Sequence, residues 1–287
     1  MGSSTNHSVN QLDAHTWRIE EGIGAGRVYM YLLEGEREAL LIDTGLGYKR
    51  LEKVVRRLTS LPVKVVNTHG HLDHISRNAY FNKVFLHHLE KEVEKESSDT
   101  VIRSQFISGI LKEVGVADWF INSPIVRLLI RRLAKIKQGT SYQYMEEGYL
   151  FSLGNRNVEV ILTPGHTPGS ICLLDIERRW LYTGDTACAK GVLLSLKFSL
   201  TVEEYRMTIE KMKAFGSRYD IMLPAHHDRL LSKDILEEYL ECIDLIYQGC
   251  AEEVLEVSAA GTAYRAVYKR ISVAFDKNRI YKTGHNF

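Results

Sequence analysis

The stretch Asn67–Asn78 reads N-T-H-G-H-L-D-H-I-S-R-N. His69 and His71 are two residues apart, so on an extended chain both side chains lie on one face and can reach the same ion. The chain then turns, which lets Asp73 and His74 point at a second position nearby. Imidazole and carboxylate groups are the ligands that Zn²⁺ and similar divalent ions bind. A lone histidine is usually a surface or core residue, but this combination predicts a metal site.

The composition is that of an ordinary globular protein. A chain of 287 residues can hold one large domain or two modest ones, and its net charge of +1 gives no sign of a nucleic-acid partner. No apolar run reaches membrane-spanning length, and Met1–Asn10 is polar, without the apolar core of a signal peptide. These features predict a soluble, cytoplasmic protein. They do not say what it does, and the small-molecule substrate that we expect rests on the motifs. The four cysteines form no C-x-x-C pair and are expected to be free thiols: Cys172, Cys188, Cys242 and Cys250.

The residues before the histidine stretch predict a β-α-β unit. Ala39–Asp43 reads as a buried strand, Leu51–Leu58 has the spacing of an amphipathic helix, and Val63–Val66 reads as a second strand. Ligand sites of α/β sheets gather at the carboxyl ends of strands, and Asp43 and His69 both fall there. We expect Asp43 to hold a ligand in place by hydrogen bonding.

Three further candidate ligands lie in the second half, each on a turn after a short apolar strand. His166 stands between two Pro-Gly pairs, Asp185 follows a glycine, and His226 is followed by His227. Taken alone, each position would indicate only a turn. The strands that precede them are Val158–Leu162, Trp180–Thr183 and Ile221–Leu223. A further pair, His87 and His88, reads as a strand end because nothing nearby repeats ligand spacing.

Residues from about 92 to 148 interrupt the strand pattern. Helices are expected at Ile102–Val114 and Ile125–Ile136, and the second carries basic residues among leucine, isoleucine and valine. We favour a helical cap over a substrate cleft, with a membrane-surface helix as the alternative. Residues from about 231 to 287 are expected to form a C-terminal helical extension, and residues 1–287 a single domain. The basic residues are Arg127, Arg131, Arg132, Lys135 and Lys137.

Taken in order, the motifs are H-x-H-x-D-H, then H, then D, then H, each at a strand end. In this pattern the chain resembles the metallo-β-lactamase superfamily of metallohydrolases, over roughly residues 39–228 outside the helical insertion. The resemblance implies an α/β fold with α+β layering, a four-layer αββα sandwich with the metal site at one edge between two sheets. Asp43 matches the strand-end aspartate that supports the site in this family.

The resemblance also implies the ligands. Two divalent ions are expected, with zinc favoured and iron or manganese as alternatives. Asp185 resembles the carboxylate that bridges the ions, and Asp73 is expected to orient the nucleophile and pass a proton to the leaving group. His227 leaves a one-residue ambiguity, although the family's Pro-x-His pattern favours His226. The first ion's ligands are His69, His71 and His166; the second ion's are Asp73, His74 and His226.

The branch of the superfamily is narrowed by Asp185. A bridging carboxylate resembles the glyoxalase II-like thioesterases, lactonases and phosphodiesterases, and Cys188 is out of register with the cysteine of true β-lactamases. Acyl-homoserine lactonases have a tyrosine where this chain has Cys188, and glyoxalase II has two glycines in place of Ser76-Arg77. We expect a dinuclear hydrolase that cleaves an ester, thioester or lactone by attack of a metal-bridging hydroxide. The alternatives are a phosphodiesterase, in which Arg77 or Lys190 meets the anion, and an iron-dependent persulfide dioxygenase.

Overall fold

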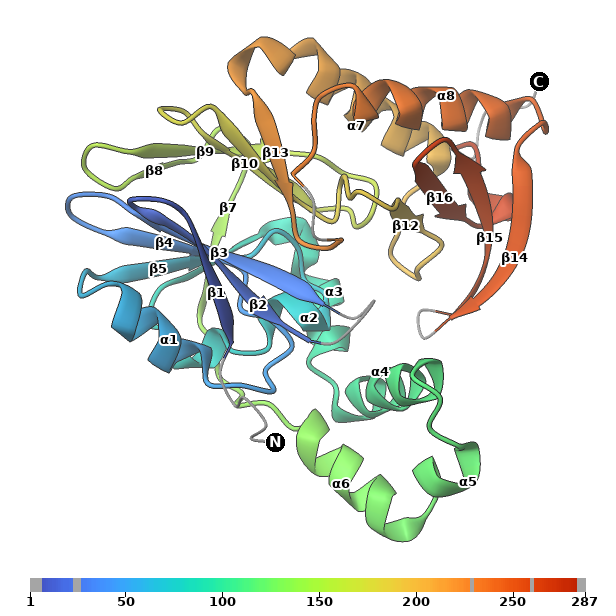
Figure 1. The fold of residues 1–287 in the computed structure, drawn as a ribbon, viewed down its shortest axis with the longest axis horizontal. Coiled ribbons are helices and arrows are strands. Elements are labelled where there is room, and N and C mark those ends of the chain that lie inside the picture. Colours follow the sequence, from blue (N-terminus) through green and yellow to red (C-terminus); the bar gives the residue numbers. More distant parts are fainter. Residues whose placement is uncertain (1–6, 23–26, 228–229, 259–260, 283–287) are drawn as a thin grey trace. The chain divides into compact units, whose positions relative to one another are not determined.

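The computed structural model describes residues 7–22, 27–227, 230–258 and 261–282. They form two compact units (Figure 1). Unit 1 comprises the described residues of the segments up to Leu86, Lys91–Tyr144 and Ser258–Gly261; unit 2 comprises those of His87–Glu90, Met145–Val257 and Thr262 onward. Within the described residues, every helix is too short or too polar to cross a lipid bilayer.

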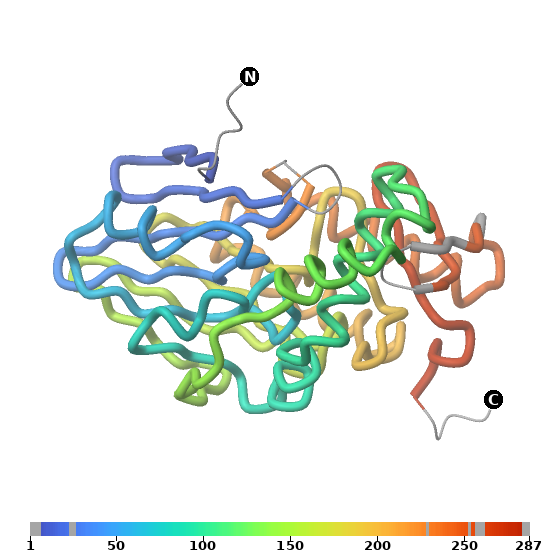
Figure 2. Tube along the Cα trace, turned by 90° about the horizontal axis from the view of Figure 1, so that it is seen from below, coloured from blue at the N-terminus to red at the C-terminus, as the bar shows by residue number. Residues whose placement is uncertain are grey.

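A seven-stranded sheet begins in unit 1. Its strands lie in chain order, β1 to β7. The first four are antiparallel neighbours, whereas β5 runs parallel to both β4 and β6. Figure 2 shows the blue strands of this sheet side by side. The strands are β1 Ser8–Asp13, β2 Thr16–Glu21, β3 Val28–Glu34, β4 Ala39–Ile42, β5 Val63–Val66, β6 Val84–His87 and β7 Tyr142–Met145.

Apolar side chains join helix α1 (Leu51–Leu58) to this sheet. Leu51 and Val55 of α1 pack with Met30, Leu41 and Val65 of the strands. This packing fixes the β4-α1-β5 crossover, so that the carboxyl ends of β4 and β5 lie at one edge. The other helical elements between β5 and β7 are α2 Leu72–Ile75, η2 Asn78–Tyr80, η3 His88–Glu90, α3 Lys91–Ser97, α4 Thr100–Glu113, α5 Asp118–Ile121 and α6 Pro124–Ala134.

Helices α4, α5 and α6 have an apolar cluster of their own. Ile107, Ile121, Ile130 and Ala134 are its buried members. Both views show these helices, teal to green, as a group beside the sheet of unit 1. The predicted helices of the insertion are therefore confirmed, while its role as a substrate cap stays a prediction.

Unit 2 contains two sheets and two long helices. The five-stranded sheet has the order β13-β11-β10-β9-β8, and the four-stranded sheet has the order β12-β16-β15-β14. Helices α7 and α8 share one apolar core with strands of both sheets. The elements are β8 Leu150–Ser152, β9 Asn157–Leu162, β10 Ile171–Asp175, β11 Trp180–Gly184, β12 Val192–Leu194, α7 Val202–Ala214, η4 Gly216–Arg218, β13 Ile221–Pro224, α8 Ile235–Tyr247, β14 Glu252–Ser258, β15 Gly261–Tyr268, β16 Ile271–Phe275 and η5 Lys277–Arg279.

The prediction of a helical C-terminal extension is wrong beyond its first helix, α8. Helix α8 ends at Tyr247 because Gly249 takes a φ of 64°. The N–H of Cys250 then donates to the carbonyl oxygen of Leu245 at 2.9 Å, and the N–H of Gly249 donates to that of Ile246 at 3.1 Å. This is a Schellman motif, which stops a helix at a residue able to adopt the left-handed conformation. Three strands, β14 to β16, follow.

Candidate metal centre

Asp43 is buried directly after β4. Its φ of 62° is a left-handed conformation that few non-glycine residues adopt. Its carboxylate accepts from the N–H and the hydroxyl of Thr68, both at 2.8 Å, and its Oδ2 lies 2.8 Å from Nδ1 of His74. With Nδ1–H donating, a neutral His74 carries its lone pair on Nε2, the nitrogen that can bind an ion. The predicted hydrogen bonding by Asp43 is therefore confirmed.

The histidine stretch gathers its side chains within unit 1. The ring centroids of His69 and His71 are 4.8 Å apart, and those of His69 and His74 are 4.0 Å apart. The chain turns into α2 after His71, as expected, and the turn brings Oδ1 of Asp73 to 3.7 Å from Nε2 of His74. His69 and His74 are buried. Unit 1 thus holds one group of three imidazoles and a carboxylate, the donor types that divalent ions prefer.

Two asparagines close the loop that carries these histidines. The side-chain amide of Asn67 donates to the main-chain oxygen of His74 at 2.8 Å, and Asn78 donates to the side-chain oxygen of Asn67 at 2.7 Å. The N–H of Thr44 also donates to the oxygen of His74, at 2.7 Å. All three residues are buried. Asn67 and Asn78 are the first and last residues of the histidine stretch, and Thr44 follows Asp43. None of the three belongs to a metal-ligand pattern, so sequence reasoning missed them.

Arg103 is a second residue that sequence reasoning missed. It lies on α4, is 2% exposed, and donates to main-chain oxygens of four segments of unit 1. Its Nη2 donates to Leu46 at 3.1 Å, its Nε to Ala134 at 2.9 Å, and its Nη1 to Leu72 at 3.4 Å. Leu72 begins α2. The helical insertion is therefore tied to the histidine stretch by one buried guanidinium.

Arg77 occupies the place where glyoxalase II-like relatives have glycine. Its guanidinium donates to Glu52 at 2.6 Å and lies 3.7 Å from the ring centroid of Tyr80. A half-buried guanidinium that is paired and stacked in this way is already engaged within unit 1. Arg77 therefore has a structural role in unit 1, and the phosphodiesterase alternative loses one of the two cations proposed for it.

In unit 2, Asp185 lies between two histidines. Strands β11 and β13 are parallel neighbours, so Asp185 and His226 follow them at the same edge. Oδ1 of Asp185 lies 3.3 Å from Nε2 of His226, and Oδ2 lies 3.5 Å from Nε2 of His166. Nδ1 of His166 is 2.8 Å from the carbonyl oxygen of Leu193, so an Nδ1–H donor again leaves the lone pair on Nε2. This unit presents one carboxylate oxygen to each histidine.

His227 differs from His226 in conformation and environment. It has a φ of 67°, and burial, with His226 nearby, lowers its pKa to about 4. Nε2 of His226 is the ring nitrogen that faces Asp185. Within unit 2 the geometry therefore favours His226, as the Pro-x-His pattern predicted.

The loop that carries His166 is fixed by contacts that require glycine. A side chain at Gly165, whose φ is 152°, would collide with the ring of Tyr205 at 2.6 Å. The N–H of Gly169 donates to the buried carboxylate of Glu90 at 2.6 Å, and a side chain there would meet Glu90 at 2.9 Å. The two Pro-Gly pairs around His166 therefore shape a loop held by close packing on both sides.

Cys188 and His87 have structural roles. Cys188 is buried, its Sγ donates to the carbonyl oxygen of Gly184 at 3.5 Å, and burial raises the pKa of its thiol well above the usual value. All four cysteines are free, as predicted. His87 ends β6, and its Nδ1 accepts from the N–H of Leu89 at 3.3 Å, which agrees with a strand-end residue.

Known proteins share this fold and these motifs. A model of the metallo-beta-lactamase superfamily matches residues 23–226. Human acyl-coenzyme A thioesterase MBLAC2 is 27% identical over 239 residues, which are 75% of this chain and 78% of that protein. The atrochrysone carboxyl ACP thioesterase of Aspergillus fumigatus is 24% identical over 200 residues, 68% of this chain and 49% of that protein. A metallo-beta-lactamase family protein from Thermus thermophilus aligns with a TM-score of 0.57 and 20% identity, over 83% of this chain and 81% of that one.

These matches confirm the predicted family and its α/β fold of mixed sheets and helices. The family model covers more than half of the chain and ends at His226, the last of the predicted ligands. The chain therefore belongs to the metallo-beta-lactamase superfamily, as a metal-dependent hydrolase.

Proposed function

We propose that this hydrolase holds two divalent metal ions and cleaves an acyl thioester of a small molecule. The observation that carries the proposal is the position of Asp185, which offers one carboxylate oxygen to each of two histidines. A carboxylate in that position suits a bridge between two ions. We propose His69, His71 and His166 as ligands of the first ion and Asp73, His74 and His226 as ligands of the second.

The donor chemistry fits zinc. His74 and His166 each place a hydrogen-bond partner at Nδ1, Asp43 in one case and the oxygen of Leu193 in the other. Such partners fix the tautomer and direct Nε2 toward an ion. Imidazole and carboxylate ligands also accept iron and manganese. Zinc is the proposal because neutral nitrogen donors predominate in the set.

The chain's own residues would handle the proton. Divalent ions held by such donors lower the pKa of a water molecule to about 7 and polarise a carbonyl group. Asp73 is half-buried, and its Oδ1 is 3.7 Å from Nε2 of His74. We propose that it accepts a proton from the attacking water and delivers it to the leaving group. Asp43 would keep His74 in the tautomer that this arrangement needs.

A thioester suits these groups better than an ester or lactone. A thiol has a pKa of about 8.5, so it can leave as a thiolate near neutral pH with little help from an acid. An alkoxide is a poorer leaving group than a thiolate, so cleavage of an ester or lactone depends more strongly on the proton that Asp73 delivers. The names of two relatives, an acyl-coenzyme A thioesterase and an acyl-carrier thioesterase, support the same class. The free thiols support a reducing compartment, and we propose the cytoplasm.

A matched substrate panel tests the thioester proposal. One acyl group is presented as a coenzyme A thioester, as an oxygen ester and, cyclised, as a lactone, with bis-nitrophenyl phosphate as the phosphodiester. We expect kcat/KM for the thioester to exceed the others by about tenfold or more, and we expect a chelator to abolish activity and Zn²⁺ to restore it. Equal rates on ester and thioester would contradict the substrate class. Persulfide-dependent oxygen consumption with one iron per chain would favour the dioxygenase alternative.

Replacement of Asp43 by asparagine should weaken metal binding without unfolding the chain. The amide keeps the shape of the carboxylate but loses the negative charge that stabilises a donating His74, so we expect the metal affinity to fall by about 10- to 100-fold. Chelator competition measures this affinity. Asp118→Asn, which alters a surface carboxylate of unit 1, is the control and should leave the affinity unchanged. Equal affinities of Asp43→Asn and the parent protein would contradict the role given to Asp43.

A further inference from the structure

Large apolar side chains are exposed on helices α5 and α6. Ile125 is 82% exposed, Trp119 78% and Leu128 70%. Isolated exposed apolar residues are common, but a group of six within fifteen residues of sequence is not. We define the α5–α6 surface by these six residues: Trp119, Phe120, Ile125, Leu128, Leu129 and Leu133.

The residues of α6 form four rows along the helix, because positions four apart lie on one face. The row Val126, Ile130 and Ala134 packs on the other helices of the insertion. The neighbouring row Ile125, Leu129 and Leu133 is exposed and entirely apolar. On the other side of the packed row, Arg127 and Arg131 form a basic row that continues to Lys135, the C-cap. Leu128 and Arg132 lie between these two exposed rows.

The arginines of α6 have no acidic counterpart in the helix. Its sequence, P-I-V-R-L-L-I-R-R-L-A, contains no carboxylate. Among the described residues 100–134, the carboxylates are Glu113 of α4 and Asp118 of α5, and Asp118 pairs with Lys112 at 2.7 Å. These two carboxylates do not balance the positive charge of the segment, and Arg127, Arg131 and Arg132 are exposed.

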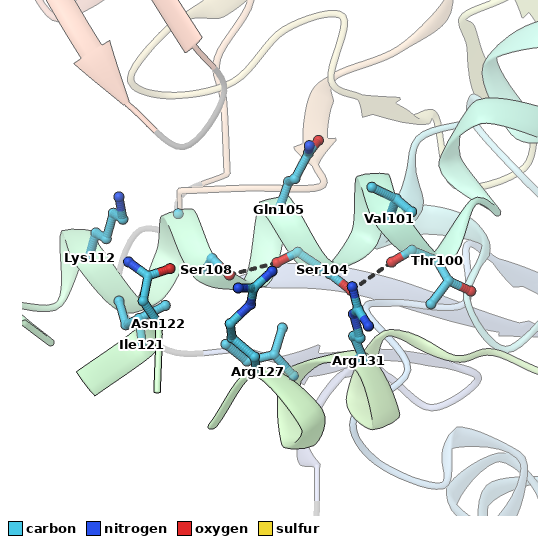
Figure 3. A pocket seen from close by; sticks show the side chains of 12 residues that line it. Thr100, Val101, Ser104, Gln105, Ser108, Lys112, Ile121, Asn122, Arg127 and Arg131 are labelled. Atoms are coloured by element: carbon cyan, nitrogen blue, oxygen red, sulfur yellow. Dashed lines mark hydrogen bonds between the residues drawn. The ribbon is translucent and has the colours of Figure 1, made fainter. Parts of the chain in front are cut away.

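A hollow of about 580 Å³ lies between α4 and α6. Figure 3 shows Arg127 and Arg131 pointing toward the hydroxyl-bearing side of α4, where Ser104 and Ser108 lie. Lys112 also lines the hollow, and its lining contains no carboxylate. Guanidinium groups in such a setting favour a phosphate, which they can bind through two parallel hydrogen bonds.

We propose that the α5–α6 surface docks on an anionic phospholipid membrane, with a lipid phosphate in the hollow. An apolar row and a basic row on either side of Leu128 and Arg132, with tryptophan near one end, match the pattern of a helix that lies in the membrane interface. Anionic lipid complements the charge, since each lysine or arginine near such a surface adds attraction. A second copy of the chain is disfavoured as the occupant, because a symmetric contact through this surface would set the arginines of both copies together.

Vesicle binding by the full-length chain tests the proposal and needs no activity. We expect co-sedimentation with vesicles of phosphatidylcholine and phosphatidylserine, weaker binding at high salt, and at least tenfold weaker binding to phosphatidylcholine alone. In a Trp17→Phe, Trp180→Phe background, the emission of Trp119 should shift to shorter wavelength on binding. Equal binding to neutral vesicles, or no binding to either, would overturn the proposal.

A matched pair of charge variants locates the binding surface. Arg131→Gln with Arg132→Gln removes two neighbouring arginines from the last turn of α6, and Arg56→Gln with Arg57→Gln does the same in α1. We expect the first pair to weaken vesicle binding by about thirtyfold and the second to change it by less than threefold. Equal losses of vesicle binding in the two variants would show that only the net charge matters, and would overturn the proposed surface.

A double variant of the exposed apolar row separates the contribution of apolar insertion to vesicle binding from the contribution of charge. Leu129→Ser with Leu133→Ser changes the exposed row only, and it should lower vesicle binding at least fivefold while circular dichroism stays native. A parent chain that elutes as a dimer, with this variant as a monomer that binds vesicles as the parent does, would make a second copy the occupant instead.

Discussion

We expect kcat/KM of the Asp185→Asn variant to be roughly 10³-fold lower than that of the parent protein. This is the upper end of the loss that follows when one electrostatic contact at a reacting centre is removed. Asparagine has the size of aspartate, but its nitrogen cannot donate an electron pair to a second ion. The two oxygens of Asp185 lie 3.3 Å from Nε2 of His226 and 3.5 Å from Nε2 of His166, and the variant would keep only one of them as an electron-pair donor. Metal analysis should fall from two ions per chain toward one or fewer, in parallel with kcat/KM.

Asp220→Asn is the control for this variant. Asp220 also belongs to unit 2, but its carboxylate is exposed and bound to Arg179. Activity and metal content should stay close to those of the parent. A native thermal transition of Asp185→Asn, measured without metal, would show that the loss comes from the site. An Asp185→Asn protein that keeps two ions and more than half its activity would contradict the bridging role.

The strands that lead to the proposed ligands were predictable because local signals agree there. Val63–Val66 was predicted with the bounds that the structure has, and the predicted Val158–Leu162 lacks only the first residue of β9. Each is a short apolar run, and each is followed by a turn or a polar residue. Strand β14 was missed because its glutamates and leucine also suit a helix, whereas the aromatic and β-branched residues of β15 and β16 are typical of strands and were not used. Gly249, which follows Gln248, was the sequence signal that the helix ends there.

Four ligand candidates could be named from their spacing and three from the resemblance to a family. Of the residues that support them, only Asp43 could be named in advance. The contact between Asp43 and His74 joins residues 31 positions apart, and the resemblance to a family made it expectable. Arg103 binds main-chain oxygens, which every residue carries, so no sequence pattern marks its partners. The grouping of the seven ligands around two ions stays a prediction, which the Asp185 variant tests.

The Asp175→Ala variant should lose about 3–5 kcal/mol of stability, because it leaves a buried guanidinium without its carboxylate. Arg156 and Asp175 are fully buried in unit 2, and Nε of Arg156 donates to Oδ2 of Asp175 at 2.8 Å. Burial raises the pKa of Asp175 although Arg156 opposes the rise. The cost of removing water from the pair is therefore not fully offset. Urea unfolding followed through Trp180, which faces Asp175 across the strands, measures the loss.

The double variant Arg156→Leu, Asp175→Leu separates two quantities: the net contribution of the pair to the free energy of unfolding, and the loss of stability when only one partner is removed. Apolar side chains of similar volume need no desolvation of charge, so we expect its stability to lie within about 1 kcal/mol of the parent or above it. Asp220→Ala breaks the exposed pair with Arg179 and should cost about 1 kcal/mol or less, because water screens that pair. If the double variant were as unstable as Asp175→Ala, the pair itself would stabilise unit 2, and the desolvation argument would be wrong. A stable double variant would instead show that the pair adds little to the free energy of unfolding, although breaking it is costly.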